Sequence, residues 1–293
     1  MTTASERILV VGATGMLGEP VARQLAADGH HVHVLSRSKE KAESLFAKEP
    51  KISSFEGNVD DLASLTEAMK GCTGIHINLS GGIMESHGTH QVIQAANALK
   101  DDNNTVVNRI SLISGVTTCE ENTWYEGTKA KLQAENILIE SGFNYTIFRC
   151  TMFMETLPKL KVLVGPQPTS WHLLAASDYA RMVSKSFTIP GVSNEILFLY
   201  GPKPPCTLPE AMNTYYIPIC DPARTPPIPT MSMEDALATV NGKTANTFNL
   251  TEKGIAKFDW LGKIHELGGP SKANNLLGAP TITLEKWCKD HAK

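Results

Sequence analysis

The stretch Ile8-Leu9-Val10-Val11-Gly12-Ala13-Thr14-Gly15-Met16-Leu17-Gly18 decides the fold of this chain. A short apolar run ends directly in a Gly-x-x-Gly-x-x-Gly pattern, which in turn opens a segment with helical spacing. The first glycine allows a tight turn, the second lets backbone amides approach a pyrophosphate, and the third lets the helix pack against the strand. The helix N-terminus adds partial positive charge. The stretch therefore predicts a dinucleotide-binding strand, turn and helix.

From this stretch to about residue 150, β-branched runs alternate with amphipathic segments. The predicted strands are 8–11, 31–35, 52–55, 75–79, 106–113 and 145–148, and the predicted helices include 62–69, 88–99 and 128–141. Such alternation is typical of βαβ units. We therefore expect an α/β fold with a doubly wound parallel sheet, the Rossmann fold. Residues 1–150 would form the nucleotide-binding domain, and 151–293 mostly a smaller substrate-binding cap with some elements returning to the sheet.

The second half of the chain lacks this regular alternation of strand and helix patterns. Nine of the seventeen prolines lie between Pro202 and Pro229, and proline cannot donate a ladder hydrogen bond. We expect an irregular segment there, anchored by Tyr215, Tyr216, Ile217 and Ile219. Helical patterns at 177–187, 233–240, 255–267 and 283–291 are expected around it. We expect this half to cover the sheet edge where the strands end, which is where open α/β folds bind ligands.

Composition excludes several classes of protein. With 42% hydrophobic and 19% charged residues and a net charge of −3, the 293-residue chain is neither disordered nor built to bind nucleic acid. No apolar run approaches the roughly 18 residues of a membrane span, and no signal peptide is recognisable. The six cysteines are scattered without metal-ligand spacing, so we expect reduced thiols, no metal site and a cytoplasmic protein.

The end of the second predicted strand favours one nicotinamide cofactor. Ser36, Arg37 and Lys39 offer a hydroxyl and two cations where an acidic residue would repel a 2′-phosphate. NADP(H) is therefore expected over NAD(H). The full set of predicted cofactor contacts comprises Gly12, Thr14, Gly15, Met16, Leu17, Gly18, Ser36, Arg37, Lys39, Asn58, Ser80, Gly81 and Lys129. Asn58 would meet the adenine, and Ser80 and Gly81 would let the nicotinamide ribose approach the backbone.

Tyr125 and Lys129 form a Tyr-x-x-x-Lys pair at the start of a predicted helix, so the two side chains would share one face. An ammonium beside a phenol lowers the pKa of the phenol, which could then pass a proton to a carbonyl oxygen during hydride transfer. Ser114 could hydrogen-bond the same oxygen. Alternatively, Tyr125 only staples the helix start, and Lys129 alone acts as the acid or orients a water. Residues expected to line an apolar substrate pocket are Phe153, Met154, Trp171 and His172.

Several segments resemble the NmrA-like group of atypical short-chain dehydrogenases/reductases. Residues 134–149 (AENILIESGFNYTIFR) resemble the helix and strand pattern AE..L..SG..YTI.R of that group. Residues 153–155 resemble FFMEN, 176–180 the..DIA helix start, and 276–287 the G.PTTTLEEW ending. Cys150 departs from the proline that is usual after the arginine. The resemblance covers nearly the whole chain and implies a Rossmann fold.

The same resemblance leaves two functions open. One is an NADPH-dependent oxidoreductase that reduces a carbonyl or conjugated alkene of a small organic substrate, with the proton from Tyr125 or Lys129. The other is a catalytically silent NADP(H)-sensing regulatory protein that signals to a protein partner. A lyase, isomerase or cyclase on the same scaffold is a third, less favoured reading. The complete Tyr-x-x-x-Lys pair favours the reductase, and many members of the group retain only the lysine.

Overall fold

The computed structural model describes residues 5–102, 104–216 and 228–291. Its main feature is a seven-stranded parallel sheet with the order β3-β2-β1-β4-β5-β6-β9. The strands are β1 (Arg7–Val11), β2 (His31–Ser36), β3 (Ile52–Glu56), β4 (Gly74–Ile77), β5 (Arg109–Gly115), β6 (Tyr145–Cys150) and β9 (Glu195–Leu199). The predicted doubly wound α/β fold is therefore confirmed.

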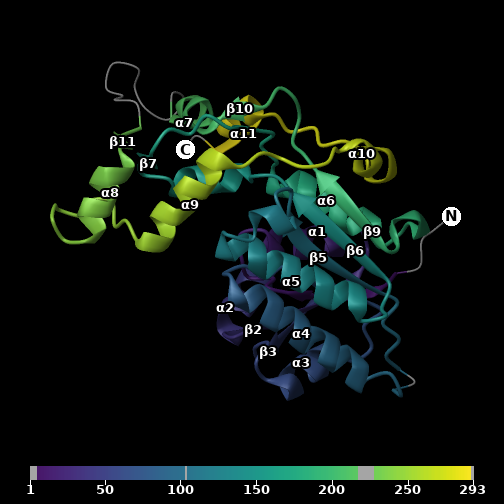
Figure 1. Ribbon diagram of the computed structural model, residues 1–293. Helices are drawn as coiled ribbons and strands as arrows, with labels where there is room; N and C mark the ends of the chain where they lie inside the picture. The colour runs from purple at the N-terminus through teal and green to yellow at the C-terminus, as the bar shows by residue number, and fades with distance from the viewer. Residues whose placement is uncertain (1–4, 103, 217–227, 292–293) are drawn as a thin grey trace. The chain divides into compact units, whose positions relative to one another are not determined.

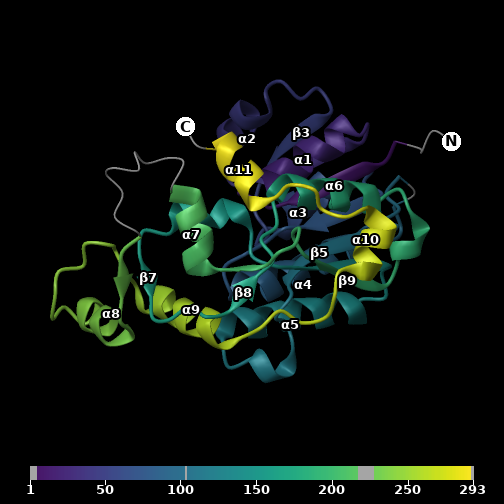
Figure 2. The same ribbon diagram turned by 90° about the horizontal axis from the view of Figure 1, so that it is seen from above.

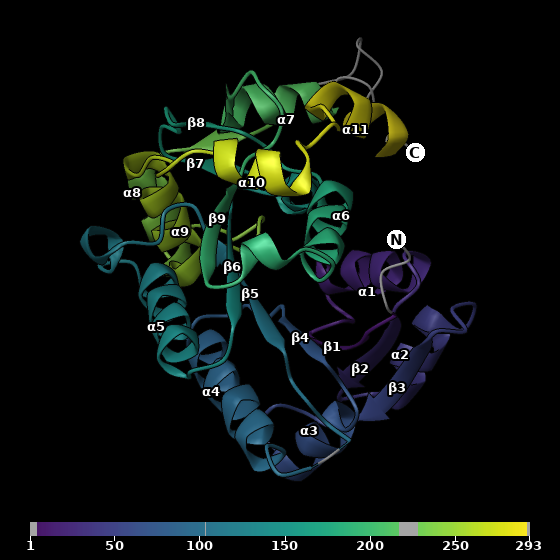
Figure 3. The same cartoon turned by 90° about the vertical axis from the view of Figure 1, so that its right-hand side faces the viewer.

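Helices cover both faces of this sheet (Figures 1 and 3). They are α1 (Gly18–Ala27), α2 (Lys39–Phe46), α3 (Leu62–Met69), α4 (Ile83–Ala98), α5 (Glu126–Glu140) and α6 (Ala176–Ser186). Helix α4 contacts α3 and α5 on one face, and α1 contacts α6 on the other. The crossovers place every strand's carboxyl end at one edge, and the loops between strands and helices lie there.

Side chains alternate between the two faces because successive residues of a strand point in opposite directions. Leu9, Ile75 and Ile110 belong to the core cluster that also contains buried residues of α3, α4 and α5. His76, the neighbour of Ile75 on β4, is fully buried and hydrogen-bonds Ser111 Oγ at 2.8 Å and Tyr179 OH at 3.0 Å. The α6 face of the sheet therefore has a polar network within its core.

The chain divides into two compact units. One contains Met1–Cys150, Ala176–Leu199 and Gly269–Ala279, and the other Thr151–Ala175, Tyr200–Gly268 and Pro280–Lys293. The first unit thus takes its seventh strand, helix α6 and helix α10 (Ser271–Leu277) from the second half of the chain. Arg181 on α6 donates to the carbonyls of Leu277 and Ala279, which ties the last of these pieces to the others.

The second unit consists of helices and short strands (Figure 2). Its elements are β7 (Leu163–Val164), β8 (Ser170–Trp171), β10 (Cys206–Thr207), α7 (Leu208–Tyr216), β11 (Thr230–Met231), α8 (Met233–Val240), α9 (Glu252–Lys263) and α11 (Leu284–His291). The second unit also has the short 3-10 helix Met154–Lys159. The first unit has two such helices, Glu120–Asn122 and Pro190–Val192. Strand β8 pairs with β10, and β7 pairs with β11.

Three predicted elements differ from the structure. Helix α4 begins at Ile83 rather than at residue 88, because the turn that starts it is made by Gly81 and Gly82, both with positive φ. The fifth strand begins at Arg109 rather than at residue 106. The proline-rich segment contains helix α7, where Pro209 stands in the first turn and so removes no helical hydrogen bond. Its predicted anchors Ile217 and Ile219, and Cys220, lie outside the described residues.

Candidate functional site

The turn after β1 is the tightest part of the candidate cofactor site. Gly12 has φ +83°, and a Cβ there would lie 2.3 Å from the carbonyl oxygen of Asn78 at the end of β4. A Cβ on Gly18 would lie 2.2 Å from the Gly12 oxygen, so helix α1 packs directly on the turn. No side chain caps α1 at Leu17, but the Glu19 amide donates to the Gly15 oxygen at 3.1 Å and Pro20 has no amide hydrogen, so an anion would meet the amides of Leu17 and Gly18. This turn fits a pyrophosphate.

The side chains expected to bind the 2′-phosphate differ in whether other groups of the protein already engage them. Ser36 is buried, and its hydroxyl donates to the Ser38 carbonyl at 2.8 Å. Lys39 is exposed, and its Nζ lies 3.8 Å from Glu43 Oε1. Arg37 is exposed and has no hydrogen bond or ion pair with any residue that the structure describes. Its guanidinium is therefore the group best able to bind a phosphate at the end of β2.

Asn58 lies just beyond β3, where the adenine is expected. Its Oδ1 accepts from the Asp60 amide at 2.7 Å in a local turn, so only the side-chain amino group remains to contact a base. Asp61, three residues on, caps helix α3 by accepting from the amides of Ala63 and Ser64. These three local hydrogen bonds give the loop after β3 a fixed shape.

The loop after β4 contains two of the expected cofactor contacts, Ser80 and Gly81. It is bonded to Glu85, a residue that sequence reasoning missed. Ser80 and Gly81 are exposed, and a Cβ on Gly81 would meet open space. The Gly81 amide donates to Glu85 Oε1 at 3.2 Å, and Glu85 Oε2 accepts from Lys131 Nζ at 2.6 Å. Glu85 is only 7% exposed. A buried carboxylate therefore ties this loop to helix α5.

Tyr125 stands just before helix α5, and Lys129 lies in its first turn. Tyr125 is the N-cap of α5 with extended backbone (φ −91°, ψ 121°), and its carbonyl accepts the helical hydrogen bond of the Lys129 amide at 3.1 Å. Burial raises the pKa of Tyr125, and Glu85 and Glu126 raise it further. This direction is opposite to the lowering of the pKa that was expected from Lys129. Lys129 is exposed and lines a groove of about 430 Å³ with Ile83 and Trp124.

Lys131, two residues further along α5, is the lysine at the ends of the central strands. A Cβ on Gly115, the last residue of β5, would lie 3.5 Å from Lys131 Cδ. Burial raises the pKa of Cys150, the last residue of β6, and Lys131 opposes that rise. The ammonium therefore lies close to the carboxyl ends of β5 and β6. The sequence contains a signal for this residue, because Lys129 and Lys131 are about 200° apart on a helix and only one can face the sheet edge.

Ser114 has a local partner. It is buried near the end of β5, and its hydroxyl lies 3.2 Å from the hydroxyl of Thr118, which is also buried. Thr117 is buried beside it. The structure thus brings Ser114 and Thr118 together.

Three of the four predicted pocket residues are buried. Phe153 forms a bridge with Leu174, Met154 begins a 3-10 helix, and Trp171 lies in β8. Phe153, Met154 and Trp171 are 7%, 1% and 4% exposed, respectively. The fourth, His172, is partly exposed.

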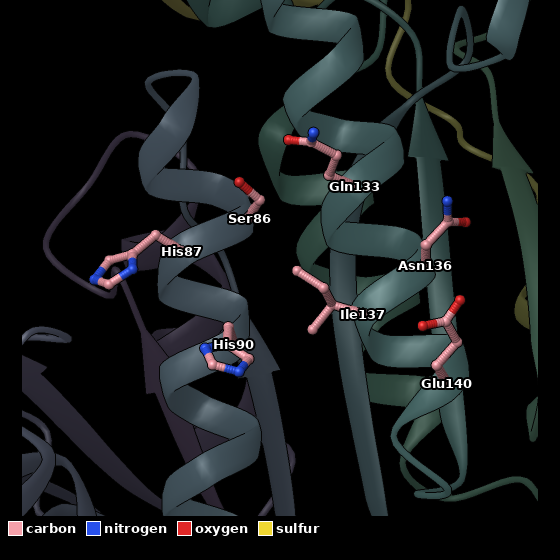
Figure 4. A pocket seen from close by; sticks show the side chains of 7 residues that line it. All are labelled: Ser86, His87, His90, Gln133, Asn136, Ile137 and Glu140. Carbon is pink, nitrogen blue, oxygen red and sulfur yellow. The ribbon is translucent and has the colours of Figure 1, made fainter.

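A second groove lies between α4 and α5, further along both helices (Figure 4). Its residues include His87, His90 and Glu140. His87 Nε2 lies 2.8 Å from Asp60 Oδ1. Within the described residues, no group of three histidine, cysteine or acidic side chains has the arrangement of a metal site.

Comparison with known proteins identifies the family. A family model described as NAD(P)H-binding matches residues 12–186, which include the glycine turn, strands β2 to β6 and helix α6. The chain belongs to this family. The match confirms the predicted NAD(P)H-binding Rossmann protein of the NmrA-like, atypical short-chain dehydrogenase/reductase group. Among the described residues, no helix of this NAD(P)H-binding protein is long and apolar enough to cross a membrane.

Individual relatives of this NAD(P)H-binding protein have different roles. The photosystem II assembly factor Ycf39 of Cyanophora paradoxa is 28% identical over 204 residues, which make up 66% of this chain and 63% of that protein. Pinoresinol reductase 1 of Arabidopsis thaliana is 33% identical over 109 residues, 35% of this chain and 34% of its own length. The chain thus spans less than two thirds of both relatives.

A solved structure shows the same fold over nearly the whole chain. The NADPH-dependent quinone oxidoreductase QOR2 of Escherichia coli, complexed with NADPH, is 20% identical and superposes with a TM-score of 0.73. The superposition covers 97% of this chain and 99% of that one. The second-half elements are therefore part of the shared fold.

Proposed function

We propose that this protein is an NADPH-dependent reductase that acts on a carbonyl or conjugated alkene of a small organic molecule. The observation that carries the proposal is the position of Lys131 and Glu85 at the carboxyl edge of a sheet whose first turn fits a pyrophosphate. NADPH, when bound, would supply the hydride. The reductase name of one relative and the quinone oxidoreductase name of the solved structure agree with this class of reaction.

Three side chains would serve the reaction, Lys131 on helix α5, Tyr125 at its start and Glu85 on helix α4. Lys131 would place a positive charge beside the developing oxyanion or donate to the cofactor's ribose, and Glu85 would hold its ammonium in place. Tyr125 keeps its proton at neutral pH because its pKa is raised, so it would act as a hydrogen-bond donor. Lys129, as predicted from the sequence, stays an alternative for the lysine role.

Nucleotide titration tests the cofactor choice. The purified protein should bind NADPH more tightly than NADH, as followed by nicotinamide or tryptophan fluorescence. Arg37→Ala should weaken NADPH binding by about tenfold or more and leave NADH binding unchanged, because only the 2′-phosphate needs the guanidinium. Equal losses for both nucleotides would remove Arg37 from the phosphate site.

A pair of lysine variants tests the placement of the catalytic cation. Lys131→Ala should lower turnover of quinones, enones or aldehydes by on the order of 10²-fold or more, whereas Lys129→Ala should change it by less than about threefold. Lys131→Arg keeps a cation beside Glu85 and separates loss of charge from loss of fold. The opposite ranking would restore Lys129 as the acting residue.

A sensor of the NADP⁺/NADPH ratio is the second candidate. The burial of Phe153, Met154 and Trp171 favours it, since these side chains were expected to line a substrate pocket. A relative named as an assembly factor points the same way. A sensor would bind both redox forms of the nucleotide with different affinities and oxidise NADPH with none of the acceptors. In either role we propose a cytoplasmic location, in keeping with the scattered cysteines.

A further inference from the structure

Helices α4 and α5 form an outer face of the first unit on which two grooves meet. Trp124 and Lys129 line the groove near the start of α5, and His90 and Glu140 line the one further along both helices. Gln133 lines both grooves. The two grooves therefore make one furrow between the helices, and Figure 4 shows its second half.

Helix α4 presents no charged side chain on this face. Its exposed residues at positions i, i+4, i+7, i+11 and i+14 form one stripe along the helix, namely Ile83, His87, His90, Gln94 and Asn97. The helix contains no lysine or arginine, and its one acidic residue, Glu85, is buried. Charged residues make up 19% of the whole chain. Depletion of charge is typical of the centre of a protein–protein interface.

Helix α5 has a matching stripe with charge only at its two ends. The stripe consists of Lys129, Gln133, Asn136 and Glu140, which are all exposed. None of the four side chains has an ion pair or hydrogen bond with a residue that the structure describes. Lys129 and Glu140 cannot pair with each other within one chain, because eleven residues of helix place them about 16 Å apart.

The α5 stripe is complementary to a second copy of itself. Its spacings of four, three and four residues read the same in both directions. If two α5 helices lie antiparallel about a twofold axis at the middle of the stripe, Lys129 faces the partner subunit's Glu140. Gln133 then faces the partner subunit's Asn136. Each ion pair and each amide pair occurs twice, as an isologous interface requires.

Apolar side chains at the two ends of the furrow fit the same arrangement. Ile83 is 73% exposed and Trp124 is 54% exposed at the end near Lys129, and Ile139 is 39% exposed at the end near Glu140. The antiparallel arrangement brings each apolar end toward the opposite end of the partner's furrow. Burial of these side chains would favour association, whereas the ion pairs and amide pairs would set its register.

We propose that two copies of this chain associate through the α4–α5 face, with their α5 helices antiparallel about a twofold axis. The face belongs to the first unit alone, and such an association would serve a reductase and a sensor alike. Lys129, when paired with the partner subunit's Glu140, is a residue of association. This role agrees with Lys131 as the lysine at the sheet edge.

Charge reversal at the ends of the stripe tests the proposal. In sedimentation equilibrium at micromolar concentrations, the wild type should have twice the mass of one chain. Lys129→Glu and Glu140→Lys each place like charges opposite each other at two positions, so each should weaken the dimer by about tenfold or more. An equal mixture of the two variants should regain the wild-type mass. The reason is that a stripe with two acidic ends then meets one with two basic ends.

Two variants on helix α3 are the matched controls. Lys70 and Glu67 form an exposed ion pair outside the α4–α5 face. Lys70→Glu and Glu67→Lys change the net charge by the same amounts as the test variants, and both should keep the mass of the dimer. Far-UV circular dichroism checks that all four variants are folded, which the exposure of the substituted side chains favours.

Three results would overturn the proposal. A wild type with the mass of one chain would leave the face to a different kind of partner. A dimer that persists in both Lys129→Glu and Glu140→Lys would associate through another surface. Single variants that are monomeric and stay so when mixed would exclude the pairing of Lys129 with the partner subunit's Glu140.

Discussion

Gly12 shows how strongly the cofactor turn depends on the lack of one side chain. Gly12→Ala should lower the free energy of unfolding by more than Gly142→Ala, because both residues have positive φ but only Gly12 also meets a neighbour, the Asn78 carbonyl. A positive φ alone costs about 1 kcal/mol or slightly more, and the 2.3 Å contact forces a backbone shift in addition. Denaturant unfolding of the two variants measures the difference. Equal losses would mean that the turn relaxes away from β4.

Burial of His76 makes the free energy of unfolding depend on pH. Burial lowers the pKa of His76 to about 3, whereas a histidine in the unfolded chain titrates near 6.5. Between these values the unfolded chain binds a proton that the folded chain does not. The free energy of unfolding should therefore be unaffected above about pH 6.5 and fall as pH decreases below it, by up to about 1.4 kcal/mol per pH unit.

His76→Gln provides the comparison, because its amide can still bond Ser111. Burial also lowers the pKa values of His30 and His33, so the wild type should lose stability in acid through several histidines. The free energy of unfolding of the variant, measured with urea between pH 4 and pH 6, should fall less steeply with decreasing pH. The reason is that the variant takes up one proton fewer on unfolding. An unchanged slope would show that His76 is protonated in the folded protein.

At the level of elements, helix α5 and strand β6 are joined by a buried ion pair. Arg149 donates to Glu135 through Nε at 3.0 Å and through Nη2 at 2.6 Å, and Glu135 is 1% exposed. Glu135→Ala should destabilise the protein by about 3–5 kcal/mol, because it leaves a guanidinium without a counter-charge. The double variant Glu135→Leu with Arg149→Met should recover most of the loss. Thermal unfolding of both variants checks this, and a double variant as unstable as the single one would contradict it.

The start of α5 also shows what the sequence could and could not predict. Apolar alternation and the glycine turn were sufficient for six of the seven strands of the parallel sheet, all except β9, because burial on both faces leaves a strong pattern. Which lysine faces the sheet edge depends on whether Tyr125 is inside the helix or caps it, a difference of one residue. Boundaries are decided by cap geometry and tertiary contacts, here the Glu85 carboxylate and Lys131, which lie 46 positions apart in sequence.

The 2.6 Å contact between His172 Nδ1 and Glu266 Oε2 was harder to predict. His172 was recognised as a candidate pocket residue, but its partner Glu266 is 94 positions away. Nothing in local periodicity connects two such residues. Helix α7 was missed for a different reason, because proline is unfavourable within a helix but acceptable in its first turn.

For the molecule as a whole, the nucleotide-binding unit is discontinuous in sequence. A chain that ends at residue 150 would lack β9, which pairs with β6, and Tyr179, which hydrogen-bonds His76. We expect this truncation to give insoluble or unfolded protein that does not bind NADPH. Circular dichroism with NADPH titration measures this, and a folded, NADPH-binding fragment would show that the later pieces only decorate the sheet.

Because of the same discontinuity, the pieces of the nucleotide-binding unit are synthesised at widely separated times. A ribosome delivers the chain from its N-terminus, at roughly 5–20 residues per second, and the residues up to Cys150 emerge with the edge of β6 still bare. The partner strand arrives only with residues 195–199, and the segment that Arg181 holds at Leu277 and Ala279 comes later still. The nucleotide-binding unit, although its first strand is made early, is therefore completed only after Ala279 has been made. Until then the nascent chain exposes an unpaired strand edge to neighbouring chains.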